Sequence, residues 1–438
     1  MNIPSLENHK HLISFKWALI YLLVTFLLFL SVFIDANRND LAELIIEIFA
    51  IFGTIILGVV VAYYYINRTR YLSLSLMFAF VFSLIIGFPS VYLYFFKGAN
   101  NGFEIVCVWG IYINSILYLL ADTKPKKHEW RQVNNLFYVV LLIVSVCQFY
   151  KIYVYFNFII SSGAGHLAIY TESEELLSRV PFFIRAVSGF SLTMALAAFY
   201  FKSPQLIKLI AFLVVASDLA IGIRNKFFFS AICMFILYLY SNEHRVRKIF
   251  KKLSRPLYIV VWFVAFSLVS YYREAYQVAF LDYFGIVLDS LSSTLAGMQY
   301  IFDMPSDSGW SSMDASIVFS QVLPLSGLGF ISDQQIAHEF SILALGDISS
   351  GIALSSSGLL ESSILCPALG GMIYTLYLLF MIAILNKGLN SKYALINFIV
   401  IAMLPGFLYS VRGELVLPIA LLLKSLPIIM ISPLLIRR

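Results

Sequence analysis

Long runs of apolar residues separated by short polar segments make up most of the chain. Many of them approach the roughly 20 residues that a helix needs to cross a bilayer. Because lipid offers no hydrogen-bond partners, each run must pair its own backbone groups, which predicts α-helices. We therefore predict an all-α polytopic membrane protein with about twelve transmembrane helices. The runs are 14–34, 42–66, 73–96, 104–121, 136–158, 182–201, 207–222, 227–241, 257–272, 363–385, 394–411 and 415–435.

The spacing of the runs divides the chain into three parts. Residues 1–272 carry nine predicted spans, and residues 363–438 carry three more. Between them lies a loop over 273–362 whose amphipathic stretches predict short helices that form a cap on the outer membrane surface. A smaller loop covers 159–181. The runs 207–222 and 227–241 almost abut, which predicts a tight helical hairpin.

Composition agrees with a membrane protein. Only 12% of the residues are charged, against roughly a quarter in soluble domains, and 61% are hydrophobic. The net charge of +6 does not indicate nucleic-acid binding, since most basic residues stand in short loops between apolar runs. With the N-terminus inside, 20 of the 30 basic residues fall on the inner side and seven on the outer side. This asymmetry predicts that both termini are cytoplasmic and that 273–362 is outside.

Six basic residues lie on the outer side or in the outer part of a span, against this bias. They are Arg224, Arg273, Arg412, Lys226, Lys151 and Arg185. Ionisable groups at membrane depth usually face a cavity or a partner, so we expect these cations to line one outward-facing cavity. Guanidinium groups suit paired hydrogen bonds to pyrophosphate. The alternatives are contacts with lipid headgroups or, for Arg412, an ion pair with Glu414.

Three residues of the outer loop are candidates for a general base, in the order Glu361, His338 and Asp282. Glu361 stands where an apolar helix begins, so a carboxylate that complements the helix start is its structural alternative. A lone histidine such as His338 is more often structural. The chain shows no metal-ligand cluster, no phosphate-binding glycine loop and no nucleophile turn, so we expect neither metal nor cofactor.

Three short segments resemble motifs of the Wzy-type polymerases of bacterial surface polysaccharides, also called O-antigen or oligosaccharide repeat-unit polymerases. The segments are Leu219–Lys226 with its Gly222-Ile223-Arg224 turn, the Ser-rich run 349–357 followed by Glu361 and Gly370-Gly371, and the late Val411–Leu415 turn with Arg412. Twelve spans with one long outer loop also fit the family. Its Arg-x10-Gly pattern is not met, because Gly285 lies one position too far from Arg273.

The resemblance implies a membrane glycosyltransferase of lipopolysaccharide biosynthesis, GT-C-like, in the cytoplasmic (inner) membrane of a bacterium. Its substrate would be an undecaprenyl-pyrophosphate-linked oligosaccharide, and its other partners membrane lipids, a chain-length regulator and a flippase. The growing glycan would leave its lipid pyrophosphate and join a new lipid-linked repeat unit. Two alternatives stay open: an O-antigen ligase, which has another acceptor, and a lipid-linked oligosaccharide flippase or transporter, for which a loop of about 90 residues is unusual.

Overall fold

The computed structural model describes residues 74–82, 85–86, 131–162, 173–241, 314–326, 336–346, 356–366 and 370–437. The predicted spans 14–34, 42–66, 104–121 and 257–272 lie outside these residues, as do Arg273 and Asp282. Of the predicted span 73–96, the part that is described contains helix α4 (Leu74–Phe82).

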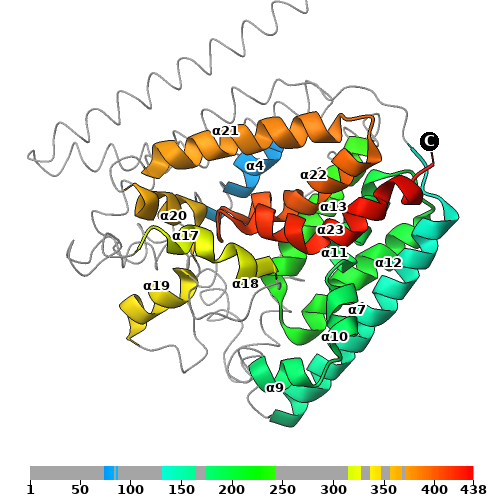
Figure 1. Ribbon diagram of the computed structural model, residues 1–438, viewed down its shortest axis with the longest axis horizontal. Helices are drawn as coiled ribbons and strands as arrows, with labels where there is room; N and C mark the ends of the chain where they lie inside the picture. The colour runs from blue at the N-terminus through cyan, green and yellow to red at the C-terminus, as the bar shows by residue number, and fades with distance from the viewer. Residues whose placement is uncertain are drawn as a thin grey trace, which may run out of the picture.

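Regular structure in the described residues is helical, apart from two isolated β-bridges. The remaining helices, labelled as in Figure 1, are α7 (Asn135–Ser162), α9 (Ser173–Ser178), α10 (Phe182–Ser188), α11 (Ser191–Tyr200), α12 (Gln205–Ala216), the 3-10 helix η5 (Ser217–Ile221), α13 (Arg224–Ser241), α17 (Ile317–Ser320), α18 (Val322–Ser326), α19 (Ile336–Leu345), α20 (Gly358–Leu365), α21 (Gly370–Leu389), α22 (Ala394–Tyr409) and α23 (Leu417–Leu435).

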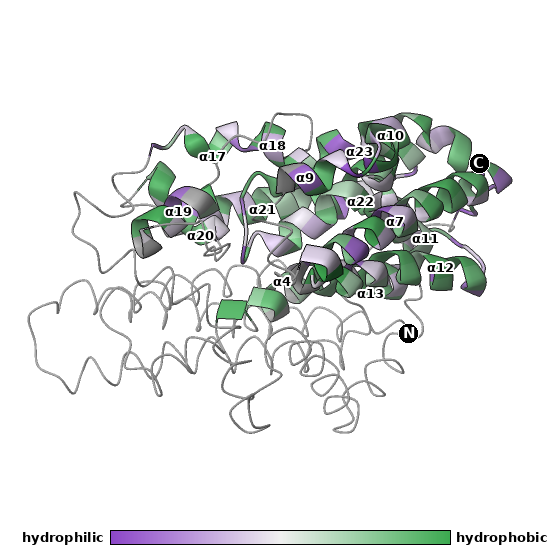
Figure 2. Ribbon diagram, turned by 90° about the horizontal axis from the view of Figure 1, so that it is seen from below, coloured by the Kyte–Doolittle hydropathy of each residue, from purple (hydrophilic) through white to green (hydrophobic). Residues whose placement is uncertain are grey.

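Four helical segments of the described chain are long and apolar enough to cross a membrane. They are Asn135–Ser162, Phe182–Tyr200, Gly370–Leu389 and Leu417–Leu435. In each, more than half of the most apolar window is not buried inside the protein. Hydrophobic residues predominate along the helices (Figure 2). Apolar surface of this extent is stable against lipid rather than water, so the chain is a helical membrane protein.

The predicted span 363–385 was placed a few residues too early. Residues 358–365 form the separate short helix α20, and the long helix α21 begins only at Gly370. Cys366 between them has an extended backbone, with φ −153° and ψ 99°. Pro367 follows it in the sequence, and a residue before proline is disfavoured in the helical conformation. The Cys366-Pro367 pair therefore separates the two helices.

The predicted hairpin of 207–222 and 227–241 is confirmed. Helix α12 continues into η5, and the chain turns at Gly222, whose φ of 80° lies in the left-handed region that favours glycine. Helix α13 begins at Arg224. Arg224 and Lys226 therefore belong to the first turn of α13 and not to the connecting turn itself.

Three segments that the charge pattern places on one side of the membrane meet at one end of the bundle. Asn134 N–H donates to the Leu435 carbonyl at 3.0 Å, Arg437 N–H to the Gln132 carbonyl at 2.8 Å, and Lys202 N–H to the Arg131 carbonyl at 3.1 Å. In Figure 1 the C-terminus accordingly lies beside the start of α7, while α17, α18, α19 and α20 gather at the opposite side. The three segments therefore lie at the same end of the bundle.

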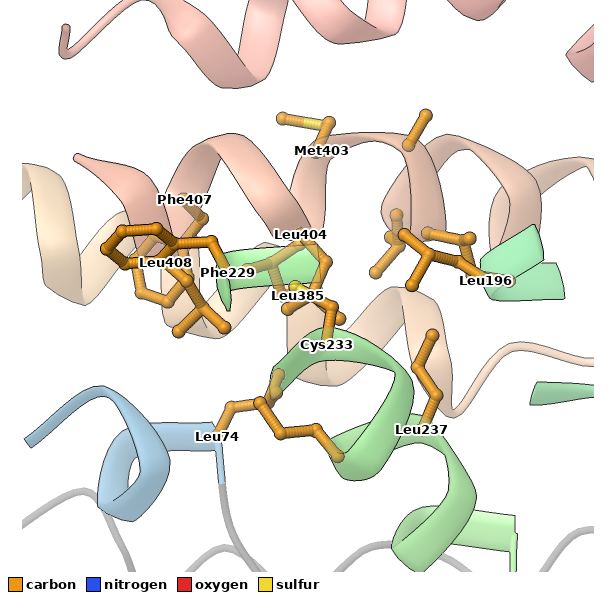
Figure 3. Close-up of a cluster of buried hydrophobic side chains, with 14 of the residues drawn as sticks. Leu74, Leu196, Phe229, Cys233, Leu237, Leu385, Met403, Leu404, Phe407 and Leu408 are labelled. Atoms are coloured by element: carbon orange, nitrogen blue, oxygen red, sulfur yellow. The ribbon is translucent and has the colours of Figure 1, made fainter. Parts of the chain in front are cut away.

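The core lies where α4, α11, α13, α21 and α22 meet. Figure 3 shows Leu74, Leu196, Cys233, Leu385 and Leu404 directed into one apolar cluster between these helices, all of them buried. Helices α22 and α23 approach closely at Gly406, where an added Cβ would lie 2.6 Å from the Pro418 nitrogen. This close pairing fixes the position of the α22–α23 turn, residues 410–416.

Candidate functional site

A buried carboxylate lies beside three lysines among the membrane-spanning helices. Asp218, in η5, is 3% exposed. Its side chain lies 2.8 Å from the Lys226 ammonium and accepts a hydrogen bond of 3.1 Å from Gln148 Nε2. The charges of Lys151 and Lys424 also interact with Asp218 and Lys226. We call Lys151, Lys226, Lys424 and Asp218 the ammonium cluster.

The ammonium cluster carries more positive than negative charge. Within the described residues, the ammonium group of Lys226 has an ion-pair partner. The ammonium groups of Lys151 and Lys424 have neither an ion pair nor a hydrogen bond there. Lys424 reaches toward the turn between α10 and α11, where a Cβ at Gly189 would lie 2.8 Å from its Cε atom. When all three lysines are protonated, three ammonium groups are therefore balanced by one carboxylate, which leaves two positive charges in excess.

Arg185 adjoins this cluster through Tyr155. The Lys151 ammonium lies 5.8 Å from the centre of the Tyr155 ring, and the charge of Arg185 acts on the same tyrosine. The Nε atom of Arg185 is buried and has no hydrogen-bond partner among the residues that the structure describes. Three of the six predicted cations, Lys151, Arg185 and Lys226, therefore come together.

Two members of the cluster were missing from the sequence prediction. Asp218 and Lys424 fall inside predicted spans, where we had assigned them no role. A signal for Asp218 does exist: it stands four positions before Gly222, and Lys226 stands four positions after it. Because a hairpin brings positions equidistant from its turn together, opposite charges at these two places indicate an ion pair.

A second polar group surrounds Glu361, which has no exposed surface. Its Oε1 accepts hydrogen bonds from Gln321 Nε2 at 3.2 Å and from Ser356 Oγ at 3.0 Å, and its Oε2 accepts one from Leu415 N–H at 2.9 Å. Burial, and next the charge of Glu414, raise the pKa of Glu361 to about 8. This carboxyl group therefore binds a proton readily near neutral pH.

Glu361 lies in the first turn of α20, but it is not the residue that caps this helix. The N-cap of α20 is Ser357, whose Oγ accepts the hydrogen bond from Leu360 N–H at 3.1 Å. Glu361 instead joins α20 to the α22–α23 turn and to the segment before α18. The N-cap is thus a serine, while the carboxylate of Glu361 stands in the first turn, where it complements the helix start as the structural alternative expects.

Arg412 lies in the turn that Glu361 holds. Its backbone N–H donates to the Tyr409 carbonyl at 2.8 Å, and its side chain is partly buried. Burial raises the pKa of the neighbouring Glu414. Docking of α20 under this turn requires a glycine at 358, where an added Cβ would lie 2.6 Å from the Tyr374 ring and 2.7 Å from the Ser410 carbonyl.

Helices α13 and α23 connect the ammonium cluster with the Arg412 turn. On α13, Phe229 lies one turn after Lys226 and packs against Tyr409, with ring centroids 4.9 Å apart. On α23, Lys424 follows Leu417 by seven positions, which corresponds to about 10 Å along a helix. The turn that contains Arg412 is therefore about two helical turns away from Lys424 along α23.

The other predicted site residues are not brought into this arrangement. Arg224 begins α13 and His338 lies in α19, but the described residues do not include their side chains. Arg273 and Asp282 lie outside the described residues. In the described ranges there is no group of three or more His, Cys, Asp or Glu side chains that could hold a metal ion.

The fold and the site together define a helical membrane protein with an excess of cations between its spans. Comparison of the chain with models of known protein families, with curated proteins and with solved structures finds no match.

Proposed function

We propose that the chain is a polysaccharide (O-antigen) polymerase. It would join undecaprenyl-pyrophosphate-linked oligosaccharide repeat units at the outer face of the bacterial cytoplasmic membrane and release the lipid pyrophosphate. The observation that carries the proposal is the gathering of Lys151, Arg185 and Lys226 with Lys424. These cations come from helices far apart in the sequence, so their convergence is a property of the fold.

The proposed reaction requires several cations at the leaving pyrophosphate. The donor glycan leaves a pyrophosphate, and negative charge develops on the leaving oxygen as the glycosidic bond breaks. Fixed cations in a site of low dielectric stabilise this charge without reorganising at the moment of reaction. Lys151 and Lys424, which have no ion-pair partner in the described residues, and the partly buried guanidinium of Arg185 would supply that positive field.

We propose that Glu361 has a positioning role and does not transfer the proton. Its oxygens already accept three hydrogen bonds from the protein, and none of its surface is exposed. We propose that it holds the Arg412 turn against α20. The base that deprotonates the acceptor hydroxyl would then be His338 or Asp282. Helices α17, α18, α19 and α20 would belong to a GT-C-like cap formed by 273–362 over the cations.

One observation favours transport as the second candidate. Gln148 and Lys151 lie near the middle of the 28-residue helix α7, and Gln148 contacts Asp218. Polar and ionisable side chains at the middle of a membrane-spanning helix often mark transport pathways. A flippase for lipid-linked oligosaccharides would also need cations for the pyrophosphate.

Replacement of Arg412 in the source bacterium separates these functions. With Arg412→Ala, a polymerase would lose long polysaccharide chains but leave single repeat units on the cell surface. Arg412→Lys would lose most long chains as well, because a point charge does not replace the paired hydrogen bonds of a guanidinium. Loss of a flippase would remove surface repeat units altogether, and loss of a ligase would leave polymerised glycan on the lipid carrier. Normal chain lengths in both variants would contradict the proposal.

A further inference from the structure

The Asp218–Lys226 ion pair sits within a cluster whose charges do not balance. We infer that Lys151, Lys226 and Lys424 form a binding site for a phosphate or pyrophosphate group, and that Asp218 is an internal counter-ion that the ligand displaces from Lys226. The contacts of the cluster carry this inference. It rests on the proposed function only for the identity of a lipid carrier as the source of the ligand.

The excess of positive charge in the ammonium cluster favours binding of an anion. Lys151 and Lys424 are partly buried, yet in the described chain they have no acidic side chain within ion-pair distance. Cations in surroundings of low dielectric are costly unless they are paired. Asp218 compensates one of three positive charges. A phosphate monoester or pyrophosphate, with about two negative charges or more, matches the remaining excess.

The location of Lys226 shows where such an anion would enter. Its side chain is 41% exposed, whereas that of Asp218 is 4% exposed, so a ligand meets the lysine first. Lys226 also lies in the first turn of the 18-residue helix α13. A helix start attracts negative charge and disfavours a cation, so Lys226 needs an anion beside it. Asp218 provides this anion in the absence of ligand, and the ligand provides it when bound.

Gln148 gives Asp218 a partner in either state. Its Nε2 group donates to Oδ1 of Asp218, while Lys226 pairs with Oδ2. When a ligand takes over the lysine, the hydrogen bond from Gln148 can persist. Displacement therefore exchanges one charged contact and does not leave the buried carboxylate without any partner.

Direct binding tests the site without reference to activity. The full-length protein would be placed in phosphatidylcholine nanodiscs, and its unfolding temperature measured against inorganic pyrophosphate. We expect a saturable rise for the wild type. Lys424→Met and Lys151→Met should each weaken binding by about 10- to 150-fold, which is the roughly 1.5–3 kcal/mol of a charged hydrogen bond converted to affinity. Lys387→Met, an exposed cation at the end of α21, is the control and should bind as the wild type does.

The counter-ion role makes a prediction of opposite sign. Asp218→Asn should bind pyrophosphate more tightly than the wild type, because no carboxylate competes for Lys226. Weaker or unchanged binding in a folded Asp218→Asn protein would overturn the counter-ion role. Equal affinity of Lys424→Met, Lys151→Met and wild type, or a wild type that responds neither to pyrophosphate nor to an anionic lipid, would overturn the site.

A second lipid arm identifies the source of the phosphate. The unfolding temperature is measured again in nanodiscs of phosphatidylglycerol in place of phosphatidylcholine, with no pyrophosphate added. Lysine-dependent stabilisation in this arm alone supports a headgroup phosphate, and stabilisation by pyrophosphate supports a terminal pyrophosphate. Chain-length analysis of Lys424→Met cells then separates the two proposals. Lost binding with normal chain lengths would keep the site and remove it from the polymerase reaction.

Discussion

Oε2 of Glu361, in α20, accepts a hydrogen bond of 2.9 Å from the backbone N–H of Leu415, which lies 54 positions further along the chain. In the same region, Gly358 N–H donates to the Ser410 carbonyl at 2.7 Å. Tyr377 of α21 donates to the carbonyl of Leu415 at 2.7 Å. The α22–α23 turn is therefore fixed from two helices, and the position of Arg412 depends on both.

Removal of the Glu361 side chain should destabilise the protein. Glu361→Ala leaves Leu415 N–H, Ser356 Oγ and one donor of Gln321 without their buried acceptor, which costs about 2–5 kcal/mol. Glu361→Gln keeps an acceptor for Leu415 and should lose less than half as much. Unfolding temperatures of purified protein in detergent measure both. An alanine variant as stable as the wild type would exclude the hydrogen-bonded role.

Stability should depend on pH through the same carboxyl group. Burial raises the pKa of Glu361 in the folded protein to about 8, from an ordinary 4.5. Below pH 4.5 the carboxyl group of residue 361 is protonated in both the folded and the unfolded chain, so its contribution to the stability is fully present. Between about pH 4.5 and 8 only the folded chain carries it, so stability falls as pH rises, by at most about 1.4 kcal/mol per pH unit.

The protonated carboxyl keeps its contact with Ser356, because a hydroxyl group can accept as well as donate. Unfolding temperatures at pH 5, 6, 7 and 8 should therefore decline for the wild type. Glu361→Gln resembles the neutral acid and should flatten the decline. The partly buried Glu414, whose pKa is also raised, adds a slope of the same sign. Parallel slopes for the two proteins would show that another group titrates.

An alanine at Gly370 should separate α20 from α21. An added Cβ would lie 2.5 Å from the Cα of Ser363 and 2.7 Å from its nitrogen, and these backbone atoms cannot move alone. We expect Gly370→Ala to lower the stability by about 1–3 kcal/mol. Met372→Ala, two positions on and 48% exposed, is the control and should change stability by about 0.5 kcal/mol or less. Equal unfolding temperatures would contradict the close packing.

The charge pattern predicts that two exposed residues lie on opposite sides of the membrane. In a chain whose four cysteines are replaced, Ser316→Cys should react with a membrane-impermeant thiol reagent in intact cells. Lys392→Cys should react only after the membrane is permeabilised. Both residues are exposed, so access to the reagent depends on the side of the membrane. Labelling of both, or of neither, in intact cells would contradict the predicted topology.

Spans were predictable where an apolar run ends at a polar turn. Helix α7 was expected over 136–158 and covers Asn135–Ser162, and α23 was expected over 415–435 and covers Leu417–Leu435. Hydrophobicity alone decides such helices. Hydrophobicity gives no signal at Cys366, which precedes a proline and whose extended backbone ends α20. The start of α21 was therefore missed.

The candidate site was less predictable, because its contacts join distant segments. Charges against the orientation bias drew attention to Lys151, Arg185 and Lys226, which lie near one another, but no role was assigned to Lys424. Nothing in the local pattern of Glu361 indicates Gln321 or Leu415 as donors. These contacts depend on the packing of α20 below the α22–α23 turn.

The backbone contacts between residues 131–134 and 435–437 set an order of events during synthesis. Asn134 also donates its side-chain amide to the carbonyl of Leu434, across 300 positions. At about 5–20 residues per second, a ribosome needs roughly 15–60 s to make that interval. During this time the start of α7 waits in the membrane without its final partners. The nascent protein must therefore keep that edge in contact with water or with the insertion machinery until α23 arrives.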